Sequence, residues 1–217
     1  MKKYLLPPLS RSLAAALMVA TLCGGLAGCA APVVVGAAIG SGVLVAADRR
    51  TSGAQVEDEG IELKAVGRIQ DTLGTRVRIS VTSYNRQVLL TGEVPNEADR
   101  QRVQQLVAGM DNVRSVINEL GILNSPTLTE RASDTLITGR VKAGLVDASE
   151  LSANAFKVVT ERGTVYLMGR VTRREADLAT EVARTTSGVK SVVRIFEYIS
   201  EEELRRLQAQ PTPPSKG

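Results

Sequence analysis

Hydrophobic and polar positions recur in the same order twice along the chain. Both repeats contain a strand with an internal glycine, at residues 87–94 (QVLLTGEV) and 164–171 (TVYLMGRV). A helical stretch and a closing strand follow in each case, the closing strand at residues 112–122 and 188–199. Ordered self-similarity of this kind predicts two copies of one structural unit.

The helical stretch of each repeat has one apolar face. The residues of this face recur at i, i+3, i+4 and i+7, which is the spacing of the buried side of a helix. Its positions are Val103, Leu106, Val107 and Met110 in the first repeat, and Ala179, Val182, Ala183 and Thr186 in the second.

Each repeat also begins with a helix and a strand upstream of these segments. The helix carries apolar residues on one face, and the strand alternates apolar with polar residues. A short hairpin connection, at residues 84–86 or 161–163, then leads into the glycine-containing strand. The apolar positions are Leu63, Val66, Ile69 and Leu73, then Val77, Ile79 and Val81, in the first repeat, and Ile137, Val141 and Leu145, then Phe156 and Val158, in the second.

The order of elements in each repeat is therefore αββαβ. A small sheet with one apolar face buries that face under two helices, which makes the fold α+β. We predict two tandem domains, each a small mixed three-stranded sheet with two helices on one face. Each unit is small for an independent core, so docking between the copies, or onto the segment before them, would add stability.

The first 28 residues have the layout of a secretory signal. Basic residues precede an apolar run at residues 13–22, which is too short to predict a transmembrane helix. The run ends at Leu26-Ala27-Gly28-Cys29, which resembles the lipobox of bacterial lipoproteins. The resemblance implies cleavage before Cys29 and acylation of that residue, with palmitate among the usual chains. Ala30, in place of aspartate, implies sorting to the outer membrane, facing the periplasm.

Residues 29–59 are predicted to form a lipidated tether and a linker. Residues 30–47 are uncharged and rich in small side chains, which is compatible with a membrane span or with a tether at the bilayer interface. We favour the tether, because Cys29 already provides an anchor and the proline and glycines make a poor helix. The charged stretch Asp48–Glu59 is predicted to be a solvated linker.

Composition removes several classes of function. The formal net charge is +4, but three of the basic residues lie in the signal, which leaves +1 on residues 29–217 and no argument for nucleic-acid binding. Histidine and tryptophan are absent, and the two cysteines are Cys23 in the signal and the acylated Cys29. We therefore predict no disulfide, no metal site, no cofactor and no enzymatic activity.

The two repeats resemble tandem BON domains. The resemblance rests on the αββαβ order, on the V-x-L-x-G-x-V strand around Gly92 or Gly169, and on the closing V-[RK]-S-V strand. It assigns one BON domain to residues 60–124 and another to residues 130–199. It implies a non-catalytic lipoprotein whose second domain binds anionic phospholipid and which supports outer-membrane integrity at the division site. An envelope scaffold that docks outer-membrane assembly or cell-wall remodelling proteins is the alternative.

The resemblance places lipid binding on the first helix of the second repeat. There Leu136 lies beside the core stripe and shares its own stripe with Arg140 and Ala143, while Arg131 and Lys142 are near in sequence. An apolar side chain flanked by cations fits a membrane interface, where the cation meets lipid phosphate. These five residues are the candidate lipid-binding site. The alternative is that Leu136 only covers the edge of the sheet.

The two strand glycines and the C-terminal segment give two further predictions. Gly92 and Gly169 predict a bulge or a close helix approach rather than a phosphate-binding loop. At the C-terminus, residues 200–217 predict a short helix, with Ser200 as its N-cap and Glu203 at the capping-box position, followed by a disordered tail.

Overall fold

The computed structural model describes residues 48–209. The predicted signal, Cys29, the tether at residues 30–47 and the tail at residues 210–217 lie outside the described residues. Both repeats belong to one compact unit, Val45–Gly217.

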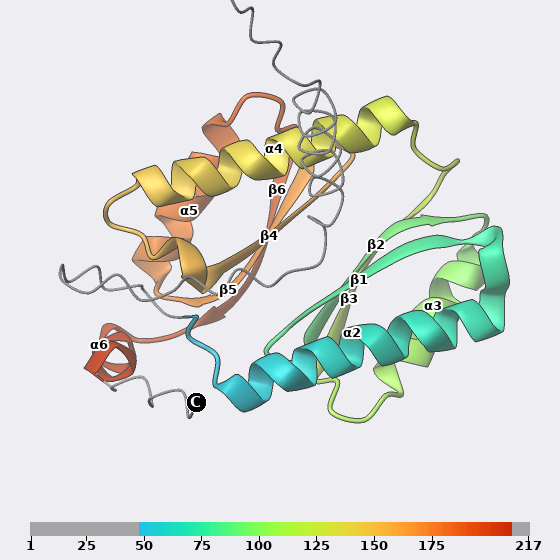
Figure 1. Ribbon diagram of the computed structural model, residues 1–217, viewed down its shortest axis with the longest axis horizontal. Helices are drawn as coiled ribbons and strands as arrows, with labels where there is room; N and C mark the ends of the chain where they lie inside the picture. Colours follow the sequence, from blue (N-terminus) through green and yellow to red (C-terminus); the bar gives the residue numbers. More distant parts are fainter. Residues whose placement is uncertain (1–47, 210–217) are drawn as a thin grey trace, which may run out of the picture. The chain divides into compact units, whose positions relative to one another are not determined.

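The first repeat contains the helix, hairpin, helix and closing strand that its sequence predicts (Figure 1). Thr51 caps the first helix by accepting a hydrogen bond from the Ala54 amide at 3.1 Å, and Asn96 caps the second through the Asp99 amide at 2.8 Å. The elements are α2 (Ser52–Leu73), the short 3-10 helix η1 (Gly74–Arg76), β1 (Arg78–Tyr84), β2 (Gln87–Val94), α3 (Glu97–Ala108) and β3 (Ser115–Ile122).

The second repeat has the same order, and both of its helices begin with a capping box. Thr127 and Glu130 form the first box, and Thr172 and Glu175 form the second. The elements are α4 (Leu128–Asp147), the 3-10 helix η2 (Ala153–Ala155), β4 (Phe156–Glu161), β5 (Thr164–Val171), α5 (Arg173–Thr185) and β6 (Ser191–Tyr198), followed by the predicted C-terminal helix α6 (Glu201–Ala209).

Each repeat forms its own mixed sheet. The strand orders are β1-β2-β3 and β4-β5-β6. The first two strands of each sheet are antiparallel, while the last strand runs parallel to the middle one. Two helices pack on one face of each sheet (Figure 1). The predicted α+β class, with a mixed three-stranded sheet and two helices in each domain, is confirmed.

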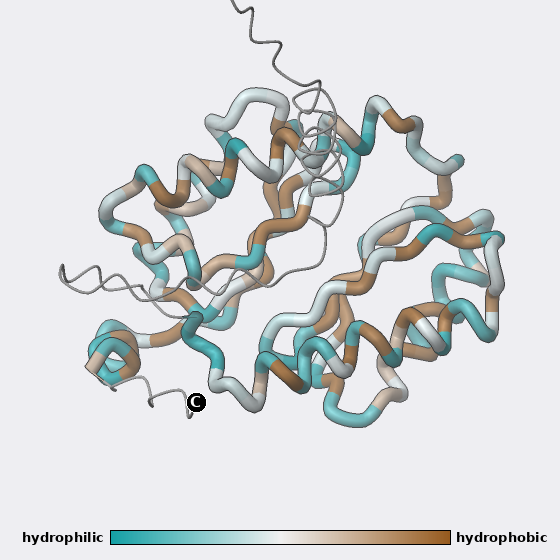
Figure 2. The backbone as a smooth tube through the Cα atoms, in the orientation of Figure 1, coloured by the Kyte–Doolittle hydropathy of each residue, from teal (hydrophilic) through white to brown (hydrophobic). Residues whose placement is uncertain are grey.

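The cores lie between the helices and the sheets, and one predicted core stripe is partly wrong. The buried side of α2 is formed by Ile61, Ala65 and the predicted Ile69 and Leu73. Leu63 and Val66, which were also predicted to belong to this face, are 77% and 36% exposed. The reason is the register of the helix, because Leu63 lies about 160° from both Ile61 and Ala65. Val66 lies at the edge of the buried stripe, about 60° from Ile69. In Figure 2 apolar and polar stretches accordingly alternate along α2 and α4.

The solvated linker predicted for Asp48–Glu59 is wrong. Helix α2 begins at Ser52, and the residues before it are held by both repeats. Arg49 donates two hydrogen bonds to the carboxylate of Glu175, at 2.8 and 2.5 Å, and a third to the Arg170 carbonyl at 2.9 Å. Burial alone would raise the pKa of Glu175, but its bonds with Arg49 and Thr172 lower it below its usual value. Arg49 of the predicted linker thus forms a buried ion pair with Glu175 of the second repeat.

A buried aspartate connects the first helix of each repeat to its hairpin. In the first repeat the Asp58 carboxylate accepts hydrogen bonds from the Asn85 and Arg86 amides at 2.7 and 2.8 Å. In the second, Asp134 accepts from the Arg162 and Gly163 amides at 2.7 and 2.8 Å. Both residues of each turn have positive φ, as two-residue hairpins with a primed turn require.

Asp58 has two further partners that Asp134 lacks. The Ser83 hydroxyl donates to it at 2.6 Å, and the Arg50 guanidinium donates at 2.7 Å. Arg50 also pairs with Asp48 and lies over the ring of Tyr84, 4.4 Å from its centroid. Burial alone would raise the pKa of Asp58, but hydrogen bonds, first among them that from Ser83, lower it. Asp58 therefore joins the start of the described chain, α2 and the hairpin.

The second faces of the two sheets bury apolar side chains against each other. They form a single cluster with members from both repeats. Burial raises the pKa of Tyr84 to about 12, and its neutral hydroxyl donates to the Ala155 carbonyl at 3.3 Å. The two repeats are therefore docked through the sheet faces that their helices leave uncovered. The buried members are Tyr84, Leu89, Tyr166, Met168 and Ile195, with Ile117, Val159 and Val193 packed against them.

Ion pairs surround this apolar contact. Arg78 binds Glu93 within the first repeat and Glu161 of the second, both at 2.6 Å, and Arg162 binds Glu93 at 3.0 Å. Glu93 is only 3% exposed, so this pairing is needed to compensate its burial. Lys157 adds a further link to Glu62 of α2 at 2.7 Å.

The two strand glycines allow one strand to approach its neighbour closely. A Cβ atom on Gly92 would lie 2.1 Å from the Arg78 carbonyl oxygen, and one on Gly169 would lie 2.5 Å from that of Ala155. The predicted close approach is thus present: the neighbouring backbone is that of β1 at Gly92 and the end of the 3-10 helix η2 at Gly169.

Candidate functional site

Helix α4 positions the candidate lipid-binding residues on its outward side. Its opposite side is fixed in the core by Ile137, Val141 and Leu145, together with the hairpin-binding Asp134. Leu136 is next in sequence to a core residue and is 60% exposed. The alternative that it covers the edge of the sheet does not fit this exposure.

The apolar stripe on α4 is longer than the sequence predicts. Leu128 is 77% exposed and Val146 is 68% exposed. Neither was predicted as a site residue, because the prediction was built around Leu136 and the residues nearest to it. The signal that could have found them is spacing, since each member of the stripe lies three or four residues from the next. The stripe consists of Leu128, Ala132, Leu136, Gly139, Ala143 and Val146.

Cations border this stripe on both sides. At 100° per residue, Arg131 and Lys142 lie along one edge of it and Arg140 along the other. All three side chains are exposed. Arg140 donates a hydrogen bond to the Ser187 carbonyl at 3.3 Å, whereas Arg131 and Lys142 form no ion pair with any residue from 48 to 209. The structure thus brings the five predicted residues together on one exposed surface, which we call the α4 face.

The matching helix of the first repeat differs at the same positions. Gly60, Lys64 and Gly67 on α2 occupy the places of Leu136, Arg140 and Ala143 on α4. The acidic Glu59 is exposed beside Gly60. The α2 surface therefore carries both signs of charge, whereas Arg140 is the one charged residue among the matching positions of α4, because Thr135 takes the place of Glu59.

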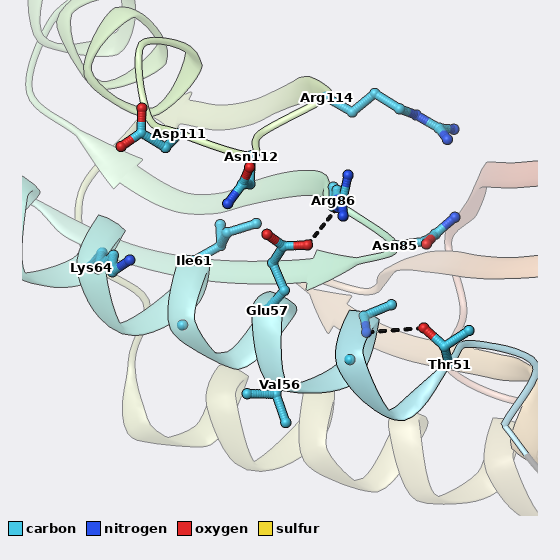
Figure 3. Close-up of a pocket in the computed structure, with 13 residues that line it drawn as sticks. Thr51, Val56, Glu57, Ile61, Lys64, Asn85, Arg86, Asp111, Asn112 and Arg114 are labelled. Carbon is cyan, nitrogen blue, oxygen red and sulfur yellow. Dashed lines mark hydrogen bonds and ion pairs between the residues drawn. The ribbon is translucent and has the colours of Figure 1, made fainter.

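A hollow of about 750 Å³ lies beside the N-terminal half of α2. Figure 3 shows Glu57 on α2 pointing toward Arg86 on the hairpin, where they form an ion pair at 2.6 Å. Lys64 and Arg114 bring further positive charge to its lining. In the second repeat Leu136 takes the place of Gly60, one of the residues that line this hollow.

The described residues contain no group of acidic, histidine or cysteine side chains arranged to bind a metal. Within the same range, no helix is long and apolar enough to cross a membrane. The candidate site is therefore a surface of apolar and cationic side chains on a small α+β domain.

Sequence comparison identifies the class of protein that carries this site. The BON domain family matches residues 58–124 and 133–199, one match to each repeat. The chain belongs to the BON domain family and carries two BON domains in tandem.

Two relatives align with this chain over most of their length. The outer membrane lipoprotein DolP of Haemophilus influenzae is 34% identical over 176 residues, which cover 80% of this chain and 90% of the relative. The 21 kDa hemolysin of Actinobacillus pleuropneumoniae is 34% identical over 154 residues, which cover 70% and 79%. The first relationship supports an outer-membrane lipoprotein of the BON family.

Proposed function

We propose that this protein is a non-catalytic, lipid-anchored outer-membrane protein whose second BON domain binds anionic phospholipid. The observation that carries the proposal is the α4 face, where Leu136 is 60% exposed between Arg140 on one side and Arg131 and Lys142 on the other. Its role would be to support the integrity of the outer membrane at the division site, facing the periplasm.

The chemistry of the α4 face fits the boundary between headgroups and acyl chains. Leu128, Leu136 and Val146 can enter the apolar layer while the cations remain at the level of the phosphates. The stripe extends over most of α4, so the helix would lie along the membrane surface. Acylated Cys29 would hold the domain at high local concentration beside the bilayer, so that a weak contact is sufficient.

An envelope scaffold is the second candidate function. It is favoured by exposed apolar residues on the first repeat, where Leu63 is 77% and Val56 69% exposed on α2. Such a surface could dock a partner from the outer-membrane assembly or cell-wall remodelling machinery.

Sedimentation with phospholipid vesicles tests the favoured function. Residues 45–217, the compact unit, should sediment with anionic vesicles, and Leu136→Asp should reduce the bound fraction by about tenfold or more, because leucine burial is lost and a carboxylate faces phosphate. Leu63→Asp on α2 is the matched control and should bind like the unchanged protein. Equal binding by the Leu136 variant would assign the contact to another surface, and no binding to any vesicle would favour the scaffold.

A second prediction concerns the preference for anionic lipid. The double variant Arg131→Gln and Lys142→Gln should lower the affinity for anionic vesicles by about thirtyfold, since each cation near the surface contributes about 1 kcal/mol and every 1.4 kcal/mol is about tenfold. Vesicle titration at low salt measures this change, and the difference should shrink as salt screens the charges. Glu130 caps α4 and should be left unchanged. An equal loss of affinity for neutral vesicles would show that the two substitutions weaken binding by disturbing the fold and not by removing a contact with anionic lipid.

A further inference from the structure

The outward side of α2 is an apolar surface with no partner in the described structure. Val56 and Leu63 are 69% and 77% exposed, and Val66 is 36% exposed. Gly53, Gly60 and Gly67 lie on the same side of the helix as Val56 and Leu63. A Cβ atom on Gly60 or Gly67 would meet nothing within 4 Å, so the fold of this chain does not require either glycine. We call this surface the α2 face.

The α2 face cannot contact the same bilayer as the α4 face. Helices α2 and α3 cover one face of the first sheet, and its other face packs against the second sheet through Tyr84, Leu89 and their neighbours. The second sheet carries α4 and α5 on its far side. The outward sides of α2 and α4 therefore point in opposite directions, and a membrane against one leaves the other in water.

Two unpaired charges border the α2 face. Glu59 lies along one edge and Lys64 along the other, and neither forms an ion pair with any residue from 48 to 209. They are five residues apart, a spacing at which side chains of one helix do not meet. In two parallel helices packed through a seven-residue repeat, however, residues five apart on opposite helices face each other. Glu59 of one copy would then meet Lys64 of the other, and two-fold symmetry would form this pair twice.

We propose that the α2 face binds the α2 face of a second copy of this chain, with the two helices parallel. The glycines leave a groove that allows close approach, while Val56 and Leu63 supply the apolar contact. Lys64 lines the adjacent hollow together with Arg86 and Arg114 (Figure 3). In the dimer Lys64 receives Glu59 of the second copy. Such an interface is small, so it forms where anchoring concentrates the copies. It leaves the two α4 faces pointing in opposite directions.

Disulfide cross-linking of the full, lipidated chain tests the contact. Val56→Cys and Leu63→Cys are placed in the chain one at a time, with Gly139→Cys, the α4 position that matches Leu63, as control. With Cys29 acylated and the signal removed, each variant has one free thiol. In neutral phosphatidylcholine vesicles oxidised with copper phenanthroline, both α2 variants should give about fivefold more dimer than the control, because equivalent residues of parallel helices meet. Yields equal to the control would overturn the proposal.

Charge exchange distinguishes the parallel pair from chance collision. In the Leu63→Cys background, Glu59→Lys and Lys64→Glu should each lower the dimer yield by about threefold, and their combination should restore it. Restoration requires a contact between copies, because these residues do not meet within one helix. Loss without restoration would overturn the parallel arrangement. Neutral vesicles keep this test independent of the proposed binding of anionic lipid.

Discussion

Replacing Asp58 with alanine is expected to lower the free energy of unfolding by about 3 to 5 kcal/mol, the range for breaking a buried ion pair. Asp58 is 1% exposed and accepts from the Arg50 guanidinium, the Ser83 hydroxyl and the amides of Asn85 and Arg86. Alanine leaves all of these donors without this acceptor. Denaturant unfolding of residues 45–217 measures the change.

The second repeat provides a control for this prediction. Asp134 accepts from the Arg162 and Gly163 amides but has no arginine side chain as a partner. Asp134→Ala should therefore cost less, about 1 to 3 kcal/mol, the cost of leaving buried donors unpaired. Equal losses in the two variants would mean that Arg50 and Ser83 contribute nothing and that the turn amides account for the whole effect.

The same carboxylate predicts a dependence on pH. The pKa of Asp58 in the folded protein lies below its ordinary value of 3.8. A depressed pKa contributes stability that is fully present above the unfolded value and is lost as the pH falls through the folded value. The stability difference between the unchanged protein and Asp58→Asn should therefore narrow below about pH 4. A difference that stays constant at lower pH would show that protonation of Asp58 is not involved.

The repeat made the fold of each domain predictable, but it did not reveal the start of the first helix. Helix α2 was placed too late because Asp58 occupies a core position, where its charge resembles that of a linker residue. Its hydrogen bonds join residues distant in sequence, so local spacing could not show them. Alignment of the two repeats offered one signal, since Asp58 and Asp134 stand at the same place ahead of Ile61 and Ile137.

Docking between the repeats was expected on grounds of size, but its surface was not identified. The middle strands hold apolar residues on both faces, such as Leu89 and Leu90 in β2 or Met168 and Leu167 in β5. Strands buried on both faces give such continuous apolar runs, whereas a strand with one solvated face alternates. That pattern was present in the sequence. The ion pairs of Arg78 and Glu93 with the second repeat depend on the docked geometry and left no local signal.

The candidate site was predictable to the extent that one helix determines it. Leu136 and its neighbouring cations share a surface because helical geometry places them there, and their exposure agrees with that prediction. Leu128 and Val146 were missed because the prediction did not follow the stripe beyond the neighbourhood of Leu136. The opposite directions of the α2 and α4 faces could not be predicted from periodicity, because they follow from the docking of the two sheets.

Gly92→Ala is expected to cost about 3 to 4 kcal/mol of stability, through backbone strain and overlap together. Gly92 has φ of 114°, and its added Cβ would lie 2.1 Å from the Arg78 carbonyl oxygen. That oxygen belongs to the backbone of β1, so relief requires the strand to move away from β2 and disturbs the nearby pair of Arg78 with Glu93. Gly139→Ala on α4 is the control: its Cβ meets nothing within 4 Å, and alanine in a helix should raise stability by about 1 kcal/mol. Thermal and denaturant unfolding of both variants measure these changes in stability, which should have opposite signs. A Gly92 variant as stable as the unchanged protein would mean that β1 can shift away from β2 at no cost.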